Sequence, residues 1–207
     1  MIKVECNGGV HEFSSETTVG KVIKKVYGKK SGAIAALVND EEKDLSHLLL
    51  EDCRIELIDA SSKEGSYIIR HSCAHLLAQA VTELFPDAKP TIGPPIDEGF
   101  YYDFYMDPID ENDLRKIEKL MKKIIKQNIP IQREEHNNET LREMFSDNPF
   151  KIEIMDEKIG EEVGSSAYRQ GKFVDLCRGP HVESTGKFKW FKLTNTSQAF
   201  WRADSSK

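Results

Sequence analysis

The sequence lacks the long apolar runs that cross membranes. No run of about 18 consecutive apolar residues occurs, so we expect neither a transmembrane helix nor a membrane partner. The amino-terminal residues, MIKVECNGGV, show no charged stretch followed by an apolar one and do not predict a secretory signal. Internal repeats and low-complexity tracts are also missing. With 39% hydrophobic and 31% charged residues among 207, the chain can form one large or two small domains.

Cysteine is scarce and widely spaced. The four cysteines are Cys6, Cys53, Cys73 and Cys177, and none forms a C-x-x-C pair with another. In a chain without a secretory signal, this distribution favours reduced thiols over a disulfide framework. We therefore expect a cytoplasmic protein.

The chain also lacks an excess of positive charge. Its formal net charge of -6 at pH 7 excludes a generally basic surface for nucleic acid, although it leaves room for a local basic patch. A nucleic-acid partner can therefore be predicted only from particular segments.

Residues 1–62 are predicted to form a small β-grasp domain of the ubiquitin type. Asn7-Gly8 is a dipeptide typical of a tight hairpin turn. Thr18 stands where it can cap a short helix that ends near Tyr27. Strand-like alternation of apolar and polar residues surrounds these signals, at Ile2–Cys6, 10–13, 33–39 and 53–60.

Residues 63–207 are predicted to form an α+β domain with two long helices and mostly antiparallel strands. The polar segment 61–66 marks the expected linker. One helix should cover 66–84, and a second should cover 111–126 with Asp110 as its cap. Strands are expected at 99–105, 150–155, 172–176 and 187–193.

Two pairs of metal-binding or catalytic residue types stand out in the second domain. His71 and His75 are four residues apart on the first predicted helix, so both imidazoles lie on one helix face. Cys177 and His181 flank Arg-Gly-Pro, a sequence that favours a turn and can bring the two side chains to one point.

Three interpretations of these pairs stay open from the residues alone. Histidines at this spacing also occur by chance on helices, and Cys73 between them fits a core position. One thiolate and three imidazoles can satisfy tetrahedral Zn²⁺. Without a metal, an imidazole can act as base toward a water molecule, or Cys177 can act as nucleophile.

The chain resembles the editing domain of threonyl-tRNA synthetases in three segments, which occur in the order of that family. They are RHSCAHLL (70–77), IGPPIDEGFYYDF (92–104) and FVDLCRGPHV (173–182). Residues 1–62 resemble the TGS domain that precedes the editing domain there. Alanyl-tRNA synthetases have similar histidine and cysteine pairs. They do not begin with a TGS domain, and FVDLCRGPHV fits the threonyl family better.

The resemblance implies hydrolysis of serine wrongly attached to threonine tRNA, with no required cofactor and zinc as the alternative. It implies catalytic residues His71, His75, Cys177, His181 and Lys151, and substrate-binding residues Tyr102 and Asp175. The corresponding roles are base or water positioning for His71, an oxyanion or ribose contact for Lys151, and an α-ammonium contact for Asp175. From the residues alone, a solvated charge at a strand end is the favoured interpretation of Lys151, and a turn cap is the favoured interpretation of Asp175; the resemblance reverses this preference.

The resemblance also implies what this polypeptide does not do. In that family an aminoacylation domain and an anticodon-binding domain follow, and no segment here resembles either one. We therefore expect no threonyl-tRNA synthesis from these residues, and a parent enzyme that dimerises through the other domains.

The expected partner is the acceptor end of threonine tRNA carrying serine. Candidate phosphate contacts are Arg115, Lys119, Lys122 and Lys126 on one helix face, and Lys187, Lys189 and Lys192 later in the chain. A solvated helix face explains the first set at least as well. Aromatic residues near the carboxyl end can stack on a base or, as is more frequent, pack in a core; they are Trp190, Phe191, Phe200 and Trp201.

Overall fold

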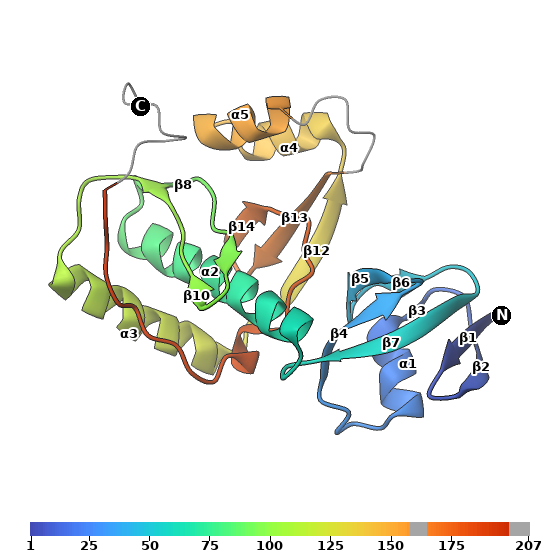
Figure 1. Cartoon of the computed structure of the whole chain (residues 1–207). Helices are drawn as coiled ribbons and strands as arrows, with labels where there is room; N and C mark the ends of the chain where they lie inside the picture. Colours follow the sequence, from blue (N-terminus) through green and yellow to red (C-terminus); the bar gives the residue numbers. More distant parts are fainter. Residues whose placement is uncertain (158–164, 199–207) are drawn as a thin grey trace.

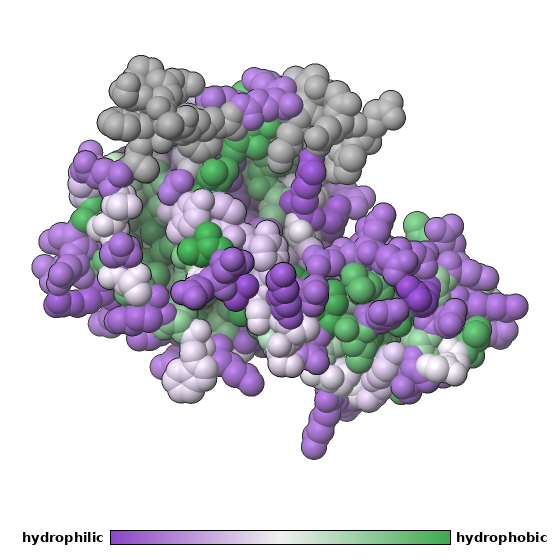
Figure 2. All heavy atoms as spheres, in the orientation of Figure 1, coloured by the Kyte–Doolittle hydropathy of each residue, from purple (hydrophilic) through white to green (hydrophobic). Residues whose placement is uncertain are grey.

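The protein is α+β, as expected, with mostly antiparallel sheets (Figure 1). The computed structural model describes residues 1–157 and 165–198. None of the described helices is both long and apolar enough to cross a bilayer. Hydrophilic residues predominate on the face of the molecule seen in Figure 2, where apolar residues reach the surface in small patches.

The first domain contains a five-stranded sheet in the order β2-β1-β7-β4-β5. The first strand lies parallel to β7, the last strand of the domain, and the other pairings are antiparallel, which is the β-grasp arrangement. Its strands are β1 Ile2–Cys6, β2 Gly9–Phe13, β4 Ala33–Val38, β5 Glu41–Asp44 and β7 Cys53–Asp59, with a separate short pair β3 Thr17–Thr18 and β6 Leu48–Leu49.

Local sequence signals explain two elements of this domain. Asn7 and Gly8 both have positive φ, as a tight turn between β1 and β2 requires. Helix α1, Val19–Val26, begins where Thr18 accepts a hydrogen bond from the backbone of Lys21. Its buried residues pack with those of the sheet in one apolar cluster.

The second domain places a three-stranded antiparallel sheet between two pairs of helices (Figure 1). The strands are β12 Ile131–His136, β13 Ser165–Gln170 and β14 Phe173–Leu176. Helices α4 Asn138–Met144 and α5 Pro149–Glu157 pack on one face, where they contact Ala167 and Val174. Tyr168 faces the opposite side and joins the core made by α2 Lys63–Leu84 and α3 Glu111–Gln127.

The remaining elements of the second domain are short. β8 Lys89–Pro90 pairs with β11 Phe104–Tyr105, β9 Pro95–Ile96 pairs with β10 Gly99–Phe100, and the 3-10 helix η1 covers Thr185–Lys187. The single strand expected at 99–105 is thus two short strands. The strand expected at 187–193 is wrong, because η1 ends within it and no strand follows among the described residues.

The strand expected at 150–155 is also wrong, because these residues belong to helix α5. The alternation in FKIEIM has the strand period, but the residues just before it begin a helix. The side chain of Asn148 accepts hydrogen bonds from the backbone of Phe150 and Lys151, and Pro149 occupies the first helical position. Burial then follows the helical spacing, at Lys151, Ile154 and Met155.

The connection between the two domains is shorter than expected. Segment 61–66 is not a linker throughout, because α2 begins at Lys63 and Ser62 caps it through the backbone of Gly65. A Cβ atom at Gly65 would lie 1.8 Å from the carbonyl oxygen of Asp59, the last residue of β7. The first turn of α2 therefore packs directly on the end of the first domain.

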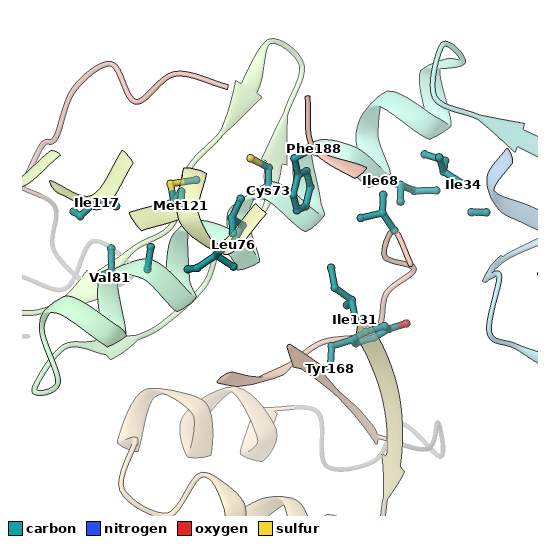
Figure 3. Close-up of a cluster of buried hydrophobic side chains, with 14 of the residues drawn as sticks. Ile34, Ile68, Cys73, Leu76, Val81, Ile117, Met121, Ile131, Tyr168 and Phe188 are labelled. Atoms are coloured by element: carbon teal, nitrogen blue, oxygen red, sulfur yellow. The ribbon is translucent and has the colours of Figure 1, made fainter. Parts of the chain in front are cut away.

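One apolar cluster extends across both domains. Ile34, Ala35 and Ile58 of the first domain belong to the same buried cluster as Ile68 of α2 and Tyr168 of β13. Figure 3 shows Ile34 and Ile68 close together, with the core of α2 and α3 beyond them. Burial of apolar side chains therefore stabilises the domain junction as it does the interior of each domain.

Candidate active site

Helix α2 presents the first pair of candidate residues. His71 and His75 are one turn apart, and their ring centroids are separated by 5.2 Å. His75 is buried, whereas His71 is partly exposed. The helical spacing on which the sequence prediction depended is therefore present.

Strand β14 and the turn after it present the second pair. Cys177 is tied to β13, since its backbone N–H donates to the carbonyl of Ser166 and its carbonyl accepts from the Ser166 hydroxyl. The chain then turns through Gly179 and Pro180, where the peptide bond is cis, and reaches His181. The turn brings Sγ of Cys177 within 3.2 Å of Nε2 of His181.

The two pairs converge on one point. Sγ of Cys177 also lies 3.2 Å from Nε2 of His71. One potential ligand atom from each of His71, His75, Cys177 and His181 lies within 4.8 Å of all the others. The structure thus brings together the four residues that the sequence analysis selected.

The protonation pattern of His181 follows from Ser72. The Ser72 hydroxyl donates to the carbonyl of Ile68, at 2.8 Å, so its proton is already used. It then accepts from Val182 N–H at 3.1 Å and lies 3.0 Å from Nδ1 of His181. Nδ1 must therefore carry a proton and donate it to Ser72, which leaves the lone pair of Nε2 facing Cys177.

A buried polar triad lies beside the histidines. Lys151, from α5, forms an ion pair with Asp175 of β14 at 2.5 Å and donates to the hydroxyl of Tyr102 at 3.1 Å. The Tyr102 hydroxyl donates to the other carboxylate oxygen of Asp175 at 2.5 Å. Nε2 of His75 lies 3.6 Å from that same oxygen. Lys151 and Asp175 are only 3% and 1% exposed, so neither is a solvated surface charge.

Burial determines the charges of the cluster. It lowers the pKa of His71 to about 4 and the pKa of His75 to about 3, and it moves the pKa of His181 well below its usual value. It raises the pKa of Cys177 to about 12. At neutral pH the imidazoles therefore have free lone pairs, and Cys177 is a thiol rather than a nucleophilic thiolate. Burial thus moves these three imidazoles out of the near-neutral range in which histidine ordinarily titrates.

Asp175 keeps its negative charge in spite of its burial. Burial favours the neutral carboxyl, but the Lys151 ammonium and the hydrogen bonds from Lys151 and Tyr102 outweigh it and hold the pKa of Asp175 below its usual value. Burial and the charge of Asp175 raise the pKa of Tyr102, so this phenol stays protonated and acts as a donor. The triad is therefore one cation, one anion and one neutral donor.

The donor set also fits a metal ion. One sulfur and three imidazole nitrogens match the ligands of tetrahedral Zn²⁺, and the Nε2 lone pair of His181 is directed toward the cluster. The backbone N–H of Gly179 lies 3.3 Å from Sγ of Cys177 and would stabilise a metal-bound thiolate. These four residues could hold zinc in a closed structural site, whereas zinc held by only three of them would keep an open position in which it could polarise a water molecule.

Several of the candidate tRNA-contacting residues have acidic partners. Arg115 pairs with Glu111, Lys187 pairs with Glu183, and Lys122 and Lys192 both contact Glu118. Trp190 is 94% exposed, so the expectation that it packs in a core is wrong. Phe191 does pack against the main cluster, whereas Phe200 and Trp201 lie outside the described residues.

Sequence reasoning missed three residues that hold the site together. Ser72 could have been selected from the sequence, because its hydroxyl stands next to the candidate His71 in the segment HSCAH. Asp44 and Tyr168, which hold the turn before His181, carried no such signal. Asp44 is 137 residues from His181 in sequence, so only the fold reveals that contact.

The chain is similar to known aminoacyl-tRNA synthetases. Residues 166–206 match the family described as the threonyl and alanyl tRNA synthetase second additional domain. A threonine–tRNA ligase of Thermoplasma volcanium is 49% identical over 184 residues, which are 89% of this chain and 26% of the relative. The threonine–tRNA ligases of Marinobacter nauticus and Streptococcus mutans are 43% and 42% identical, over 97% and 100% of this chain and 32% of each relative.

Proposed function

We propose that this chain, homologous over most of its length to part of the threonine–tRNA ligases, hydrolyses the ester of serine wrongly attached to threonine tRNA. The observation that carries the proposal is the convergence of His71, His75, Cys177 and His181 beside the buried triad of Lys151, Asp175 and Tyr102. These groups offer what hydrolysis of an activated acyl ester needs: a proton acceptor for water and a cation for the developing oxyanion.

His71 is the proposed proton acceptor. It is the least buried of the three clustered histidines, and its lowered pKa leaves it neutral, with a lone pair available. Water would attack the acyl carbon and pass a proton to His71, and the ribose hydroxyl would leave with a proton. Cys177, His75 and His181 would orient this water as neutral groups. The aminoacyl ester is already activated, so a weak base is sufficient.

Lys151 and Asp175 would recognise the charged parts of the substrate. The Asp175 carboxylate is a suitable partner for the α-ammonium of an amino acid, and Lys151 for the oxyanion or the terminal ribose. Both are held in place by Tyr102, which contacts each of them. Because the two charges already neutralise each other, the empty site avoids the free-energy cost of an unpaired buried charge.

Selectivity would depend on one methyl group. Serine lacks the γ-methyl of threonine, and a pocket contact with a single methyl gives only about 1–3 kcal/mol of discrimination. A separate site that accepts serine and sterically excludes threonine adds a second selection step. The candidate residues lie close together, with ring centroids of His75 and His181 4.2 Å apart, as a site for a small side chain requires.

The decisive experiment is a deacylation assay with two esters. The chain is incubated with threonine tRNA carrying either serine or threonine, and release of each amino acid is followed. We expect selective release of serine, and loss of that release in His71→Ala. Equal stability of both esters with the folded chain would refute the proposal and favour a domain that binds RNA without chemistry.

The second candidate function is a zinc site, favoured by the compact set of one thiol and three imidazoles. Elemental analysis of protein purified without a metal-affinity tag distinguishes the two. Zinc at one equivalent per chain, lost in Cys177→Ala, would support the metal interpretation. Serine release that persists after chelation would support the metal-free one.

The proposed function also implies a partner, a role for the first domain and a cellular compartment. Its partner would be the acceptor end of threonine tRNA, and residues 1–62 would form a TGS domain. The chain spans about a quarter to a third of the length of the curated relatives it matches. Dimerisation of a parent synthetase, and a place in the cytoplasm, follow from the resemblance and remain proposals.

A further inference from the structure

One carboxylate of the first domain contacts the turn that carries His181. Asp44 is the last residue of β5 and only 7% exposed. Its Oδ1 accepts from the backbone N–H of His181 at 2.6 Å, and its Oδ2 accepts from the hydroxyl of Tyr168 at 2.6 Å. Both interactions cross from the first domain into the second.

Tyr168, which donates to Asp44, also packs against the turn that carries His181. Its ring lies edge-on to the ring of His181, with centroids 4.3 Å apart. A Cβ atom at Gly179 would lie 1.9 Å from the Tyr168 hydroxyl oxygen, so the turn passes directly over this hydroxyl. Asp44 therefore holds the turn at two points, through the His181 backbone and through Tyr168.

We propose that Asp44 is a positioning residue of the active site, so that the first domain forms part of the hydrolytic apparatus rather than only an RNA-binding appendage. This inference rests on the proposed function. Ser72 of α2 holds the imidazole of His181, and Asp44 holds its backbone, so the two supports come from different domains. Without Asp44, the His181 amide and the Tyr168 hydroxyl both lose their buried acceptor, and Nε2 of His181 is no longer held against Cys177.

Substitutions of Asp44 can separate positioning from simple stability. Asp44→Ala removes both acceptors. Asp44→Asn keeps the shape, with one oxygen for the His181 amide and an N–H group that can donate to Tyr168. Val22→Ala is the matched control, because Val22 is fully buried in the core of the same domain but belongs to a separate apolar cluster. It should destabilise the first domain without touching the turn.

The first readout is single-turnover release of serine, measured at a temperature where every variant is folded. We expect Asp44→Ala to slow the step by about tenfold or more, Asp44→Asn to restore most of the rate, and Val22→Ala to stay close to the parent chain. The proposal is overturned if Val22→Ala loses as much rate as Asp44→Ala, or if Asp44→Ala keeps the parent rate.

The second readout does not depend on hydrolysis. Hydrogen exchange of the His181 amide should be slow in the parent chain, in Asp44→Asn and in Val22→Ala, and much faster in Asp44→Ala. Unchanged protection in Asp44→Ala would overturn the positioning role. If the parent chain released no serine, the proposed function would fail, and the exchange of this amide would still decide whether Asp44 holds the turn.

Discussion

The hydroxyl of Ser72 joins the helix that carries His71 and His75 to the turn that carries His181. It accepts from the backbone of Val182 and from Nδ1 of His181, while its own proton is held by the carbonyl of Ile68. A single buried oxygen thus sets both the position of the turn and the tautomer of the imidazole.

Ser72→Ala should therefore impair hydrolysis by changing His181. The variant leaves the backbone N–H of Val182 and the Nδ1–H of the His181 ring without an acceptor, at a cost of about 1–3 kcal/mol each when buried. We expect a slower serine release and a lower free energy of unfolding, measured by single-turnover kinetics and denaturant titration. Thr82→Ala removes a hydroxyl from the same helix, one that bonds only to helix carbonyls, and should leave the rate unchanged. Equal rates for the two variants would contradict this role.

Gly93 allows the ring of Tyr102 to reach the triad. A Cβ atom at Gly93 would lie 2.2 Å from Cδ2 of Tyr102, whereas a Cβ atom at Gly99 would meet nothing within 4 Å. Gly93→Ala should displace the ring from Asp175, destabilise the chain by about 1–3 kcal/mol and reduce serine release. Gly99→Ala is the control from the same segment. Similar thermal midpoints and rates for both alanine variants would refute the close packing.

Acid should change the stability of the parent chain and of the Lys151→Met variant in opposite directions, because the variant leaves the buried Asp175 without its cation. The pKa of Asp175 is lowered, so its contribution to stability is full above the unfolded pKa of about 3.9 and is lost as pH falls further. In Lys151→Met the cation is gone and burial raises the pKa of Asp175. That variant should be destabilised by about 3–5 kcal/mol at neutral pH and should regain stability on acidification.

A second substitution completes this test. Adding Asp175→Asn to Lys151→Met removes the unpaired charge and should recover much of the lost stability at neutral pH, because neither partner then needs the other. The measurement is the free energy of unfolding of the parent, Lys151→Met, Asp175→Asn and the double variant between neutral pH and pH about 3. Additive losses would contradict a coupled pair.

Glu118 fastens the segment after η1 to helix α3. It contacts Lys122 at 2.6 Å, Lys192 at 3.0 Å and the backbone of Leu193 at 3.3 Å, and these contacts lower its pKa to about 2. The resulting stability is full above pH about 4.5 and is lost as pH falls toward 2. Glu118→Gln should be less stable than the parent at neutral pH, with the difference vanishing in acid. Glu111→Gln alters an exposed pair and should change little.

Local signals in the sequence were enough to predict several helices, including the one that carries His71 and His75. Thr18 and Asp110 cap α1 and α3 as expected, and the i, i+4 spacing of His71 and His75 lies on a helix. Each of these predictions depends on residues within one helical turn of each other, where chemistry and geometry are closely linked. The turn at Gly179 and Pro180 was also predicted from neighbouring residues alone.

The errors occurred where tertiary packing decides. FKIEIM alternates like a strand, but Asn148 and Pro149 start a helix there, and packing on the sheet then buries Lys151. Strand β12 was missed because IQREEH is mostly polar, and its pairing with β13 becomes visible only in the fold. The neutral state of the histidines was unpredictable for the same reason, since residues far away in the sequence, such as Tyr168 and Asp175, pack against them.

The tight junction between β7 and α2 has a mechanical consequence. Only residues 60–62 separate the two elements, and the Asp59 carbonyl fills the space where Gly65 has no side chain. A connection this short and closely packed leaves no free segment that could act as a hinge between the domains. A rotation of the first domain about this joint would break the contacts of Asp44 with the His181 amide and with Tyr168.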